Sequence, residues 1–176
     1  MIPIIQDICL WNKARYEPVY NKKLTYNLLE EEIKEYTLAL DKEDLLEICD
    51  GLGDAFYVAV GALWKYGYGV VEITEIIDAV PFIVPPPVAL TWVKINDDPR
   101  VIGMFAKSVY AQLIIFTTAT IALDILRAIC KSNNTKEVVK TKPSIKANIN
   151  KGSLYVSPIK DITNLLNKLG NNNGLQ

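Results

Sequence analysis

A chain of 176 residues, half of them hydrophobic, is long enough for one domain with a sizeable buried core. Its 19 basic and 20 acidic side chains leave a net charge of −1, so no global field would attract nucleic acid or an anionic membrane, and neither is expected as a partner. The chain has no histidine, which excludes a histidine-based triad, a histidine zinc site and a histidine general base.

The first half of the sequence predicts three helices. Apolar spacing favours a short helix over residues 4–16 and a second helix from Thr25 to Leu40, with Thr25 or Asn27 as its N-cap. A polar turn follows at residues 41–44. The third helix is expected over residues 44–66, ending at the glycines that follow it. The second and third helices should therefore form an antiparallel hairpin.

The middle of the sequence predicts one short helix and then a connector. Isoleucines and valines at helical spacing favour a helix over residues 70–80. The three prolines at 85–87 are incompatible with the interior of a helix. We therefore expect residues 81–96 to form an extended connector.

A further helix should begin where Asp98, a good N-cap, precedes Pro99. It is predicted to continue to about Cys130 and is apolar on most faces, as in a helix buried in a core or an interface. Its longest apolar run is too short to span a membrane. Another amphipathic segment lies at 159–169, and residues 170–176 are expected to fray. The prediction is a single all-α domain over residues 1–176, a bundle of four to five helices around the hairpin.

Two rows of carboxylates face each other in this hairpin. Residues three or four apart share a helix face, so Glu32 and Glu35 project together from the second helix. Glu47, Asp50 and Asp54 form the corresponding row on the third helix. The short turn places the two rows at similar heights. Facing carboxylates repel unless cations lie between them, and their oxygen atoms suit Mg²⁺. A solvated acidic surface remains the alternative from spacing alone.

These residues resemble the signature of the MazG-like pyrophosphohydrolases. The sequence Glu31-Glu32-Ile-Lys-Glu35, followed by Glu47-Ile-Cys-Asp50, is similar to their EExxE…ExxD motif, and some phage and bacterial members have a second aspartate at the place of Asp54. Residues 131–136 resemble the Ser-Asn-x-x-Lys segment after the last core helix. Residues 151–158 resemble the Lys-Gly…Pro segment that follows it.

The resemblance implies an activity and a set of site residues. The family hydrolyses nucleoside triphosphates between the α and β phosphates with Mg²⁺, for which Mn²⁺ substitutes. Glu31 and Glu35 would be catalytic, with Glu31 orienting or deprotonating the attacking water. The implied metal ligands are Glu32, Glu35, Glu47, Asp50 and Asp54. The residues implied to contact the nucleotide or its phosphates are Lys131, Asn133, Lys136, Asn12 and Trp11.

One departure from the family is large. In typical relatives a short stretch separates the hairpin from the Ser-Asn-x-x-Lys segment, whereas here an insertion occupies about residues 69–122. We expect this insertion to build a subunit interface or to cover the base. Trp92 within it is a candidate for stacking on a base, although packing is the commoner role of such a residue.

The composition also indicates compartment and assembly. The 3 cysteines are odd in number and lack metal-site spacing, which is typical of a reducing compartment. Residues 1–10 are apolar but have no basic region of the kind that opens a signal peptide. We expect a cytoplasmic protein, in the host cytoplasm if it is viral. The large apolar fraction predicts a homo-oligomer, a dimer or a tetramer.

Three functions are therefore weighed. The first is a Mg²⁺-dependent pyrophosphohydrolase that converts a nucleoside triphosphate to the monophosphate and pyrophosphate, with a preference for purine deoxynucleotides suggested by the phage members. The second is the sister reaction on phosphoribosyl-ATP. The third is a non-catalytic helical protein that binds nucleotides or acts as a scaffold. Replacing Glu35 by Gln or Asp50 by Asn should abolish the activity of an enzyme and leave a solvated surface unaffected.

Overall fold

The computed structural model describes residues 1–138, 149–150 and 154–173 of the chain. The regular secondary structure of this part is helical except for one antiparallel pair of two-residue strands, β1 (Glu137–Val138) and β2 (Ile149–Asn150). The all-α class is thus confirmed. The helices are α1 (Ile2–Lys13), α2 (Lys22–Asp41), α3 (Leu45–Lys65), α4 (Val70–Asp78), α5 (Pro86–Ile95), α6 (Pro99–Phe116), α7 (Ala119–Asn134) and α8 (Ile159–Asn173).

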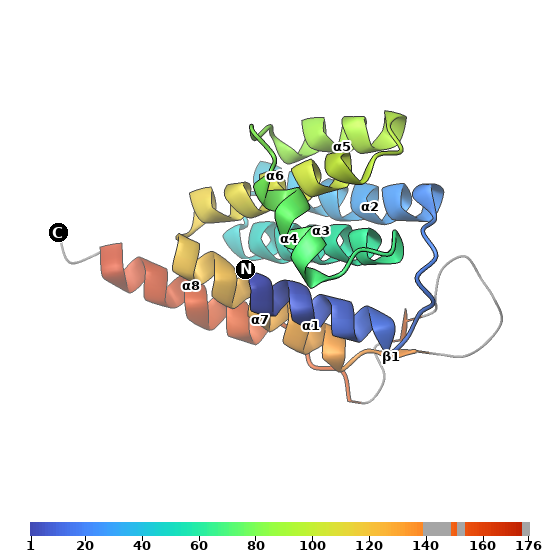
Figure 1. Cartoon of the computed structure of the whole chain (residues 1–176). Coiled ribbons are helices and arrows are strands. Elements are labelled where there is room, and N and C mark those ends of the chain that lie inside the picture. Colours follow the sequence, from blue (N-terminus) through green and yellow to red (C-terminus); the bar gives the residue numbers. More distant parts are fainter. Residues whose placement is uncertain (139–148, 151–153, 174–176) are drawn as a thin grey trace.

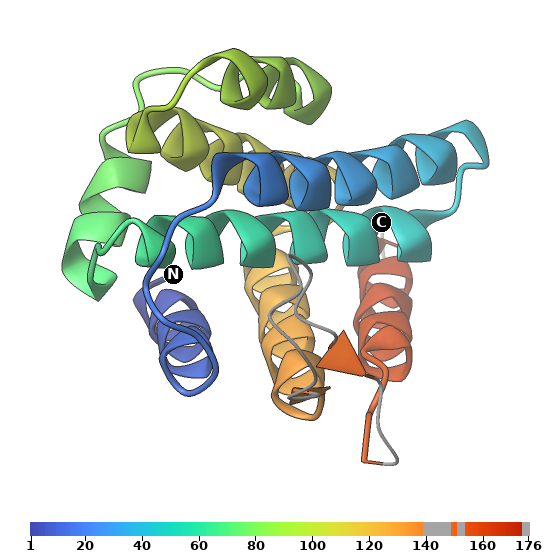
Figure 2. The same cartoon turned by 90° about the vertical axis from the view of Figure 1, so that its right-hand side faces the viewer.

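Helix α3 is the centre of the molecule. It contacts α2 and α6 as well as α1, α7 and α8 (Figure 1). Seen from the side, α2 runs along α3 while α1, α7 and α8 lie across its opposite face (Figure 2). Apolar and small residues cover α3 almost all round, from Ile48 to Leu63, because it has neighbours on most sides. Its polar residues, which include Asp50 and Asp54, are therefore exceptional.

The turn of the predicted hairpin has a defined local chemistry. Asp44 caps α3, since its carboxylate accepts hydrogen bonds from the backbone N–H groups of Leu46 and Glu47 at 3.1 and 3.2 Å. The preceding Glu43 has a left-handed φ of 54°, which reverses the chain between the helices. At the other end, Gly67 has a φ of 98° and ends the helical region, as the sequence predicted.

The start of α2 differs from the prediction. The cap is Asn21, whose side-chain oxygen accepts from the backbone N–H of Leu24 at 2.9 Å, rather than Thr25 or Asn27. The two lysines at positions 22 and 23 carry no helical pattern of their own. A helix start that rests on one polar cap was therefore placed one turn too late.

The expected connector over residues 81–96 is wrong in its second half. Residues 86–95 form α5, with proline at its first two positions. Proline is unfavourable only after the first turn, because earlier backbone N–H groups have no partner within the helix. The run of prolines therefore starts a helix, which packs on α6 and α2.

The single helix expected from Arg100 to about Cys130 is also wrong. The chain breaks between Phe116 and Ala119, and α6 and α7 meet at a bend of 118°. Thr118 caps the new helix by accepting from the backbone N–H of Ile121 at 3.2 Å. Among the described helices, no single helix is long and apolar enough to span a membrane. Only α6 and α7 taken together, as a bent pair, have that length and composition.

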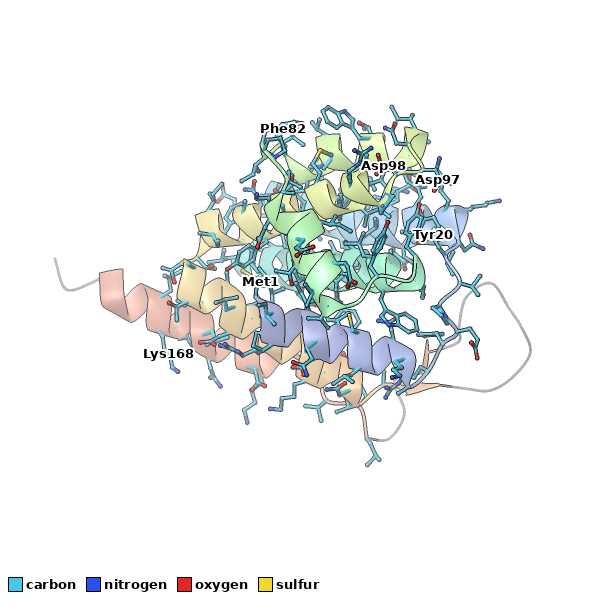
Figure 3. All side chains as sticks on the ribbon, viewed as in Figure 1. Met1, Tyr20, Phe82, Asp97, Asp98 and Lys168 are labelled. Atoms are coloured by element: carbon cyan, nitrogen blue, oxygen red, sulfur yellow. The ribbon has the colours of Figure 1, made fainter. Side chains whose placement is uncertain are left out.

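A cluster of tyrosines fixes the C-terminal end of α3. Tyr20, in the linker before α2, stacks on Tyr66 with ring centroids 3.7 Å apart. The Tyr66 hydroxyl donates to Asp97, in the linker before α6, at 2.6 Å. Tyr20 and Asp97 lie on the same side of the molecule (Figure 3). This cluster anchors the end of the helix that carries Lys65.

Candidate functional site

The carboxylates of α2 and α3 act on one another across the hairpin. Burial, followed by the charge of Asp54 and then those of its helix neighbours, raises the pKa of Glu32 to about 8. Burial, followed by the charges of Asp54 and Glu47, raises the pKa of Asp50 to about 7. Glu35 contributes to both shifts. Glu35 and Asp54 are therefore close enough to both Glu32 and Asp50 to affect their ionisation.

Asp50 is the most unusual of these carboxylates. Its Oδ1 atom is buried and has no hydrogen-bond partner. A buried carboxylate oxygen without a donor is costly, so it indicates a place for a ligand that the protein alone does not fill. The positive charge of Lys136 is the one basic contribution to the pKa values of both Glu32 and Asp50, which places that lysine beside the cluster.

A close approach of the two helices supports this cluster. A Cβ atom at Gly51 would lie 3.3 Å from the backbone nitrogen of Tyr36 and 3.5 Å from the carbonyl oxygen of Glu32. Glycine therefore lets the backbone of α3 touch that of α2 at the level of the carboxylates.

The remaining predicted ligands lie at the margin of the cluster. Glu31, Glu35 and Glu47 are exposed, whereas Glu32, Asp50 and Asp54 are half-buried. As the side chains are placed, no three cysteine, aspartate or glutamate groups of the described residues already surround one point where a metal ion would fit.

A pocket of about 190 Å³ opens next to the carboxylates. Glu32 and Asp54 belong to its wall, so the pocket and the carboxylate cluster are continuous. Four residues predicted to contact the nucleotide also line it, namely Trp11, Asn12, Asn133 and Lys136. The other lining residues are Tyr16, Leu28, Tyr57, Val58, Gly61 and Lys65.

Specific contacts hold helices α1 and α7 at this pocket. The indole N–H of Trp11 donates to the backbone carbonyl of Asn133 at 2.8 Å. The amide of Asn12 donates to the carbonyl of Ile8 at 2.9 Å, and a Cβ atom at Gly61 would lie 3.1 Å from that amide. The glycine therefore lets Asn12 lie directly on α3.

One part of the chain matches a known protein family. Residues 11–81, which include α2, α3 and the start of the pocket wall at Trp11, match the family model described as phosphoribosyl-ATP pyrophosphohydrolase. Over these residues the chain is similar to this family, which supports a relationship to the MazG-like pyrophosphohydrolases. Their members are hydrolases that act on phosphoric anhydrides, and the match supports a nucleotide pyrophosphohydrolase-type function. No curated protein and no solved structure matched the chain.

Lys131 does not line this pocket, unlike the other four residues predicted to contact the nucleotide. Its ammonium pairs with Asp161 of α8 at 3.0 Å, in a polar groove between α7 and α8. Residues 151–158 resemble the MazG-like Lys-Gly…Pro motif. Positions 151–153 of this segment lie outside the described residues.

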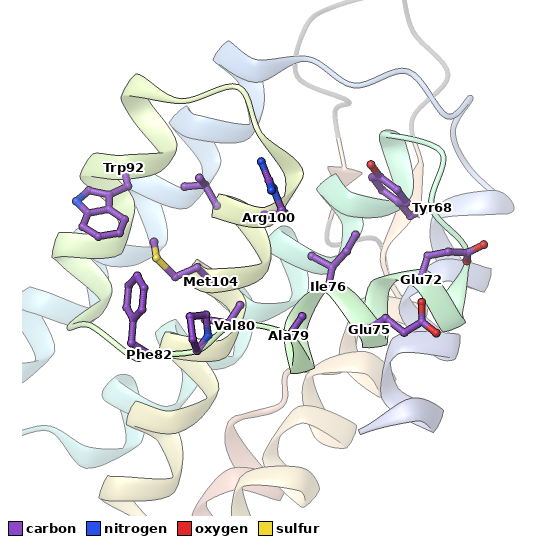
Figure 4. A pocket seen from close by; sticks show the side chains of 12 residues that line it. Tyr68, Glu72, Glu75, Ile76, Ala79, Val80, Phe82, Trp92, Arg100 and Met104 are labelled. Atoms are coloured by element: carbon purple, nitrogen blue, oxygen red, sulfur yellow. The ribbon is translucent and has the colours of Figure 1, made fainter.

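Trp92 also lies outside the pocket next to the carboxylates. It packs edge-to-face on Phe82, with ring centroids 5.9 Å apart, in a largely apolar hollow of about 600 Å³ between α4, α5 and α6 (Figure 4). This hollow is larger than the pocket of about 190 Å³ but shares no lining residue with it. Its walls hold no residue of the MazG-like motif.

The sequence reasoning missed three polar residues of the pocket. Tyr57 and Lys65 lie one and three helical turns beyond Asp54 on the same face of α3, so helical spacing from Asp54 was a signal that could have found them. Tyr16 lies in a linker, because α1 ends at Lys13 rather than at residue 16 as predicted, so helical spacing did not place it.

Proposed function

We propose that this protein is a Mg²⁺-dependent nucleoside triphosphate pyrophosphohydrolase that cleaves between the α and β phosphates. Water and a nucleoside or deoxynucleoside triphosphate would give the monophosphate and pyrophosphate. One observation carries the proposal: carboxylates of two helices are held partly buried against each other, and Asp50 Oδ1 among them has no hydrogen-bond partner. The match to the pyrophosphohydrolase family supports the same reaction class.

The donor set fits a hard divalent cation. Carboxylate oxygens are the ligands that Mg²⁺ and Mn²⁺ prefer, and partly buried carboxylates of like charge are stable as anions only beside a cation. The buried Oδ1 atom of Asp50 has no hydrogen-bond partner and is available as a metal ligand. The exposed side chains of Glu35 and Glu47 would complete the coordination.

The residues of the cluster have distinct tasks in this proposal. Glu32 and Asp50 would be the inner ligands, while Glu35, Glu47 and Asp54 would complete the set. A bound divalent cation supplies neutralisation of the triphosphate and activation of water. Glu31, next to Glu32, would accept the proton of the attacking water on its carboxylate.

Lys136 and the pocket position the nucleotide. The charge of Lys136 acts on both Glu32 and Asp50, and its ammonium would neutralise phosphate oxygens at the cluster. Asn133 also lines the pocket. The aromatic side chains of Trp11 and Tyr57 also line the pocket and would provide apolar surface for a nucleoside.

A product-resolved hydrolysis assay tests the proposal. The protein is incubated with the common ribo- and deoxyribonucleoside triphosphates, with Mg²⁺ and with EDTA, and both products are separated. We expect the monophosphate and pyrophosphate to appear only with metal, and purine deoxynucleotides to be among the faster substrates. Release of the diphosphate and orthophosphate, or turnover that is unchanged in EDTA, would contradict the proposal.

A second candidate reaction is hydrolysis of phosphoribosyl-ATP. It is favoured by the description of the family that residues 11–81 match. The same assay distinguishes the two reactions, because turnover of phosphoribosyl-ATP with inert triphosphates would select the second. If no substrate turns over but nucleotides bind with metal, the non-catalytic alternative is selected instead.

A further inference from the structure

The pocket extends well beyond the carboxylates along one face of α3. Asp54, Tyr57, Val58, Gly61 and Lys65 recur at helical spacing, and all of them line it. From Asp54 to Lys65 this face is about 16 Å long, at a rise of about 1.5 Å per residue. That length is comparable with an extended nucleotide whose phosphates lie at Asp54, so the far end at Lys65 is where a base would lie.

Lys65 has an unusual environment for a lysine. Its ammonium lies over the ring of Tyr16, 4.7 Å from the centroid. Burial lowers its pKa. Among the residues that the structure describes, no carboxylate lies within ion-pair distance of it, whereas Lys34 and Lys131 each have one. The ammonium therefore keeps hydrogen-bond donors for a ligand, and it has lost part of its hydration.

The walls before Lys65 suit a planar ring. Trp11, Tyr16 and Tyr57 provide aromatic surface, and Leu28 and Val58 provide aliphatic surface. A volume of about 190 Å³ is too small for a whole nucleotide in a closed cavity but suits a base with its sugar at the mouth. An ammonium in the wall of such a pocket offers donors only, so it favours a ring edge that presents oxygen acceptors.

We propose that Lys65 selects the base of the nucleotide by donating a hydrogen bond to an exocyclic carbonyl oxygen. Guanine, hypoxanthine, uracil and thymine carry such an oxygen where adenine and cytosine carry an amino group, which would direct N–H donors at the ammonium. The preferred ligands are therefore nucleotides with keto bases. This inference rests on the proposed function for the orientation of the substrate, with its phosphates at the carboxylates.

Kinetics on matched base pairs tests the selection. Specificity constants are measured for dGTP against dATP and for dTTP against dCTP, with the wild type and with Lys65→Met. We expect the wild type to favour the keto base by about tenfold or more, as for a substrate hydrogen bond that an analogue lacks. Lys65→Met should remove this preference by slowing the keto substrates while leaving the amino substrates nearly unchanged. A wild type that prefers amino bases, or an unchanged ranking in Lys65→Met, overturns the inference.

Lys94→Met is the matched control. Lys94 also lies over a tyrosine ring, 5.3 Å from the centroid of Tyr26, but it is exposed and does not line the pocket. Lys94→Met should keep the wild-type preference for keto bases. Both variants lose one positive charge, so a difference between them cannot come from the loss of charge alone. Methionine has nearly the length of lysine and tolerates partial burial, and Lys65→Gln serves as a second variant if Lys65→Met does not fold.

A binding measurement separates this inference from the proposed function. Calorimetric titration of dGMP and dAMP into the wild type and Lys65→Met, with Mg²⁺ present, needs no turnover. Tighter binding of dGMP that is lost in Lys65→Met supports the role of Lys65 even if no triphosphate is hydrolysed, in which case only the proposed reaction fails. Hydrolysis with equal affinity for both monophosphates in both proteins preserves the reaction and overturns the role of Lys65.

Discussion

At the scale of single residues, Asp50 joins the chemistry of the site to the stability of the fold. Its Oδ1 atom is buried without a partner, and its pKa is raised chiefly by burial. A group of this kind is unfavourable for the ligand-free protein and favourable for a cation. The same side chain should therefore lower stability and support function, as polar groups at functional sites often do.

The substitution Asp50→Asn separates these two effects. It should lower Mg²⁺-dependent hydrolysis by more than about 100-fold, because it removes a ligand rather than a supporting contact. It should also raise the melting temperature in EDTA, because a neutral amide is cheaper to bury than a carboxylate. Activity and thermal unfolding, each with metal and with EDTA, check the prediction. Asp41→Asn is the control, since Asp41 is exposed at the end of α2.

The raised pKa values also predict how stability depends on pH. For Glu32 the pKa rises from 4.5 to about 8, and for Asp50 from 3.8 to about 7. Between these limits the folded protein binds more protons than the unfolded chain, so stability is greatest below the lower values and falls as pH rises. The metal-free protein should therefore become less stable between pH values of about 4 and 8, by a few kcal/mol.

Urea unfolding in EDTA across this pH range measures the effect. Asp50→Asn should show a shallower loss of stability than the wild type, and saturating Mg²⁺ should flatten or reverse the slope by binding the ionised carboxylates. A wild-type curve that rises with pH in EDTA would mean that the carboxylates are already compensated within the protein.

At the scale of helices, the contact between α2 and α3 determines the spacing of the carboxylates. Gly51→Ala places a methyl group 3.3 Å from the backbone nitrogen of Tyr36, which only a shift of a helix can relieve. Overpacking of this kind costs about 1–3 kcal/mol, and the better helix propensity of alanine offsets about 1 kcal/mol of it. We expect lower stability and weaker Mg²⁺ binding, measured by urea unfolding and by metal titration.

Gly170→Ala is the matched helical control. A Cβ atom at Gly170 would have nothing within 4 Å, so alanine should stabilise α8 by about 0.5–1 kcal/mol. The two substitutions are thus expected to have opposite signs. If Gly51→Ala also stabilises the protein and leaves metal affinity unchanged, the close approach of the helices does not determine the geometry of the site.

The hairpin could be predicted from sequence because its signals are local. Apolar spacing, Asp44 as a cap and the glycines after Tyr66 agree on the bounds of α3, and carboxylate spacing then fixes which side chains face α2. The failures at α5 and α6 have different causes. Prolines at 85–87 both end and start helices, and the break at Thr117–Thr118 lies in an apolar stretch whose helical pattern continues across it.

The pocket could be predicted only in part. Asn133 and Lys136 were identified from a resemblance, whereas Tyr16 carries no pattern and Lys65 lies far along α3 from the carboxylates. Which lysine faces a pocket depends on the packing of α1 and α7, which the sequence does not encode locally. Lys131 illustrates this point, because it lies on the same helix as Asn133 but pairs with Asp161.

At the scale of the whole molecule, the site is assembled from distant parts of the chain. The family match covers residues 11–81, yet Asn133 and Lys136 complete the pocket from beyond the inserted helices. The hydrogen bond from Trp11 to the carbonyl of Asn133 joins these parts directly, at 2.8 Å. The insertion is thus compatible with the pocket because α7 returns to α1 and α3.

The substitution Trp11→Phe tests this connection. It retains an aromatic ring but loses the indole N–H, and the carbonyl of Asn133 keeps a second donor in the backbone N–H of Lys136 at 3.1 Å. The loss should therefore be about 0.5–1.5 kcal/mol of stability, the net value of one hydrogen bond. Because Asn133 and Lys136 would be held less firmly while the carboxylates stay in place, we expect KM for the nucleotide to rise and kcat to change little.

Trp64→Phe, at a tryptophan of α3 outside the pocket, should leave KM unchanged. An equal KM in Trp11→Phe and the wild type would mean that the two parts of the chain are held together by other contacts.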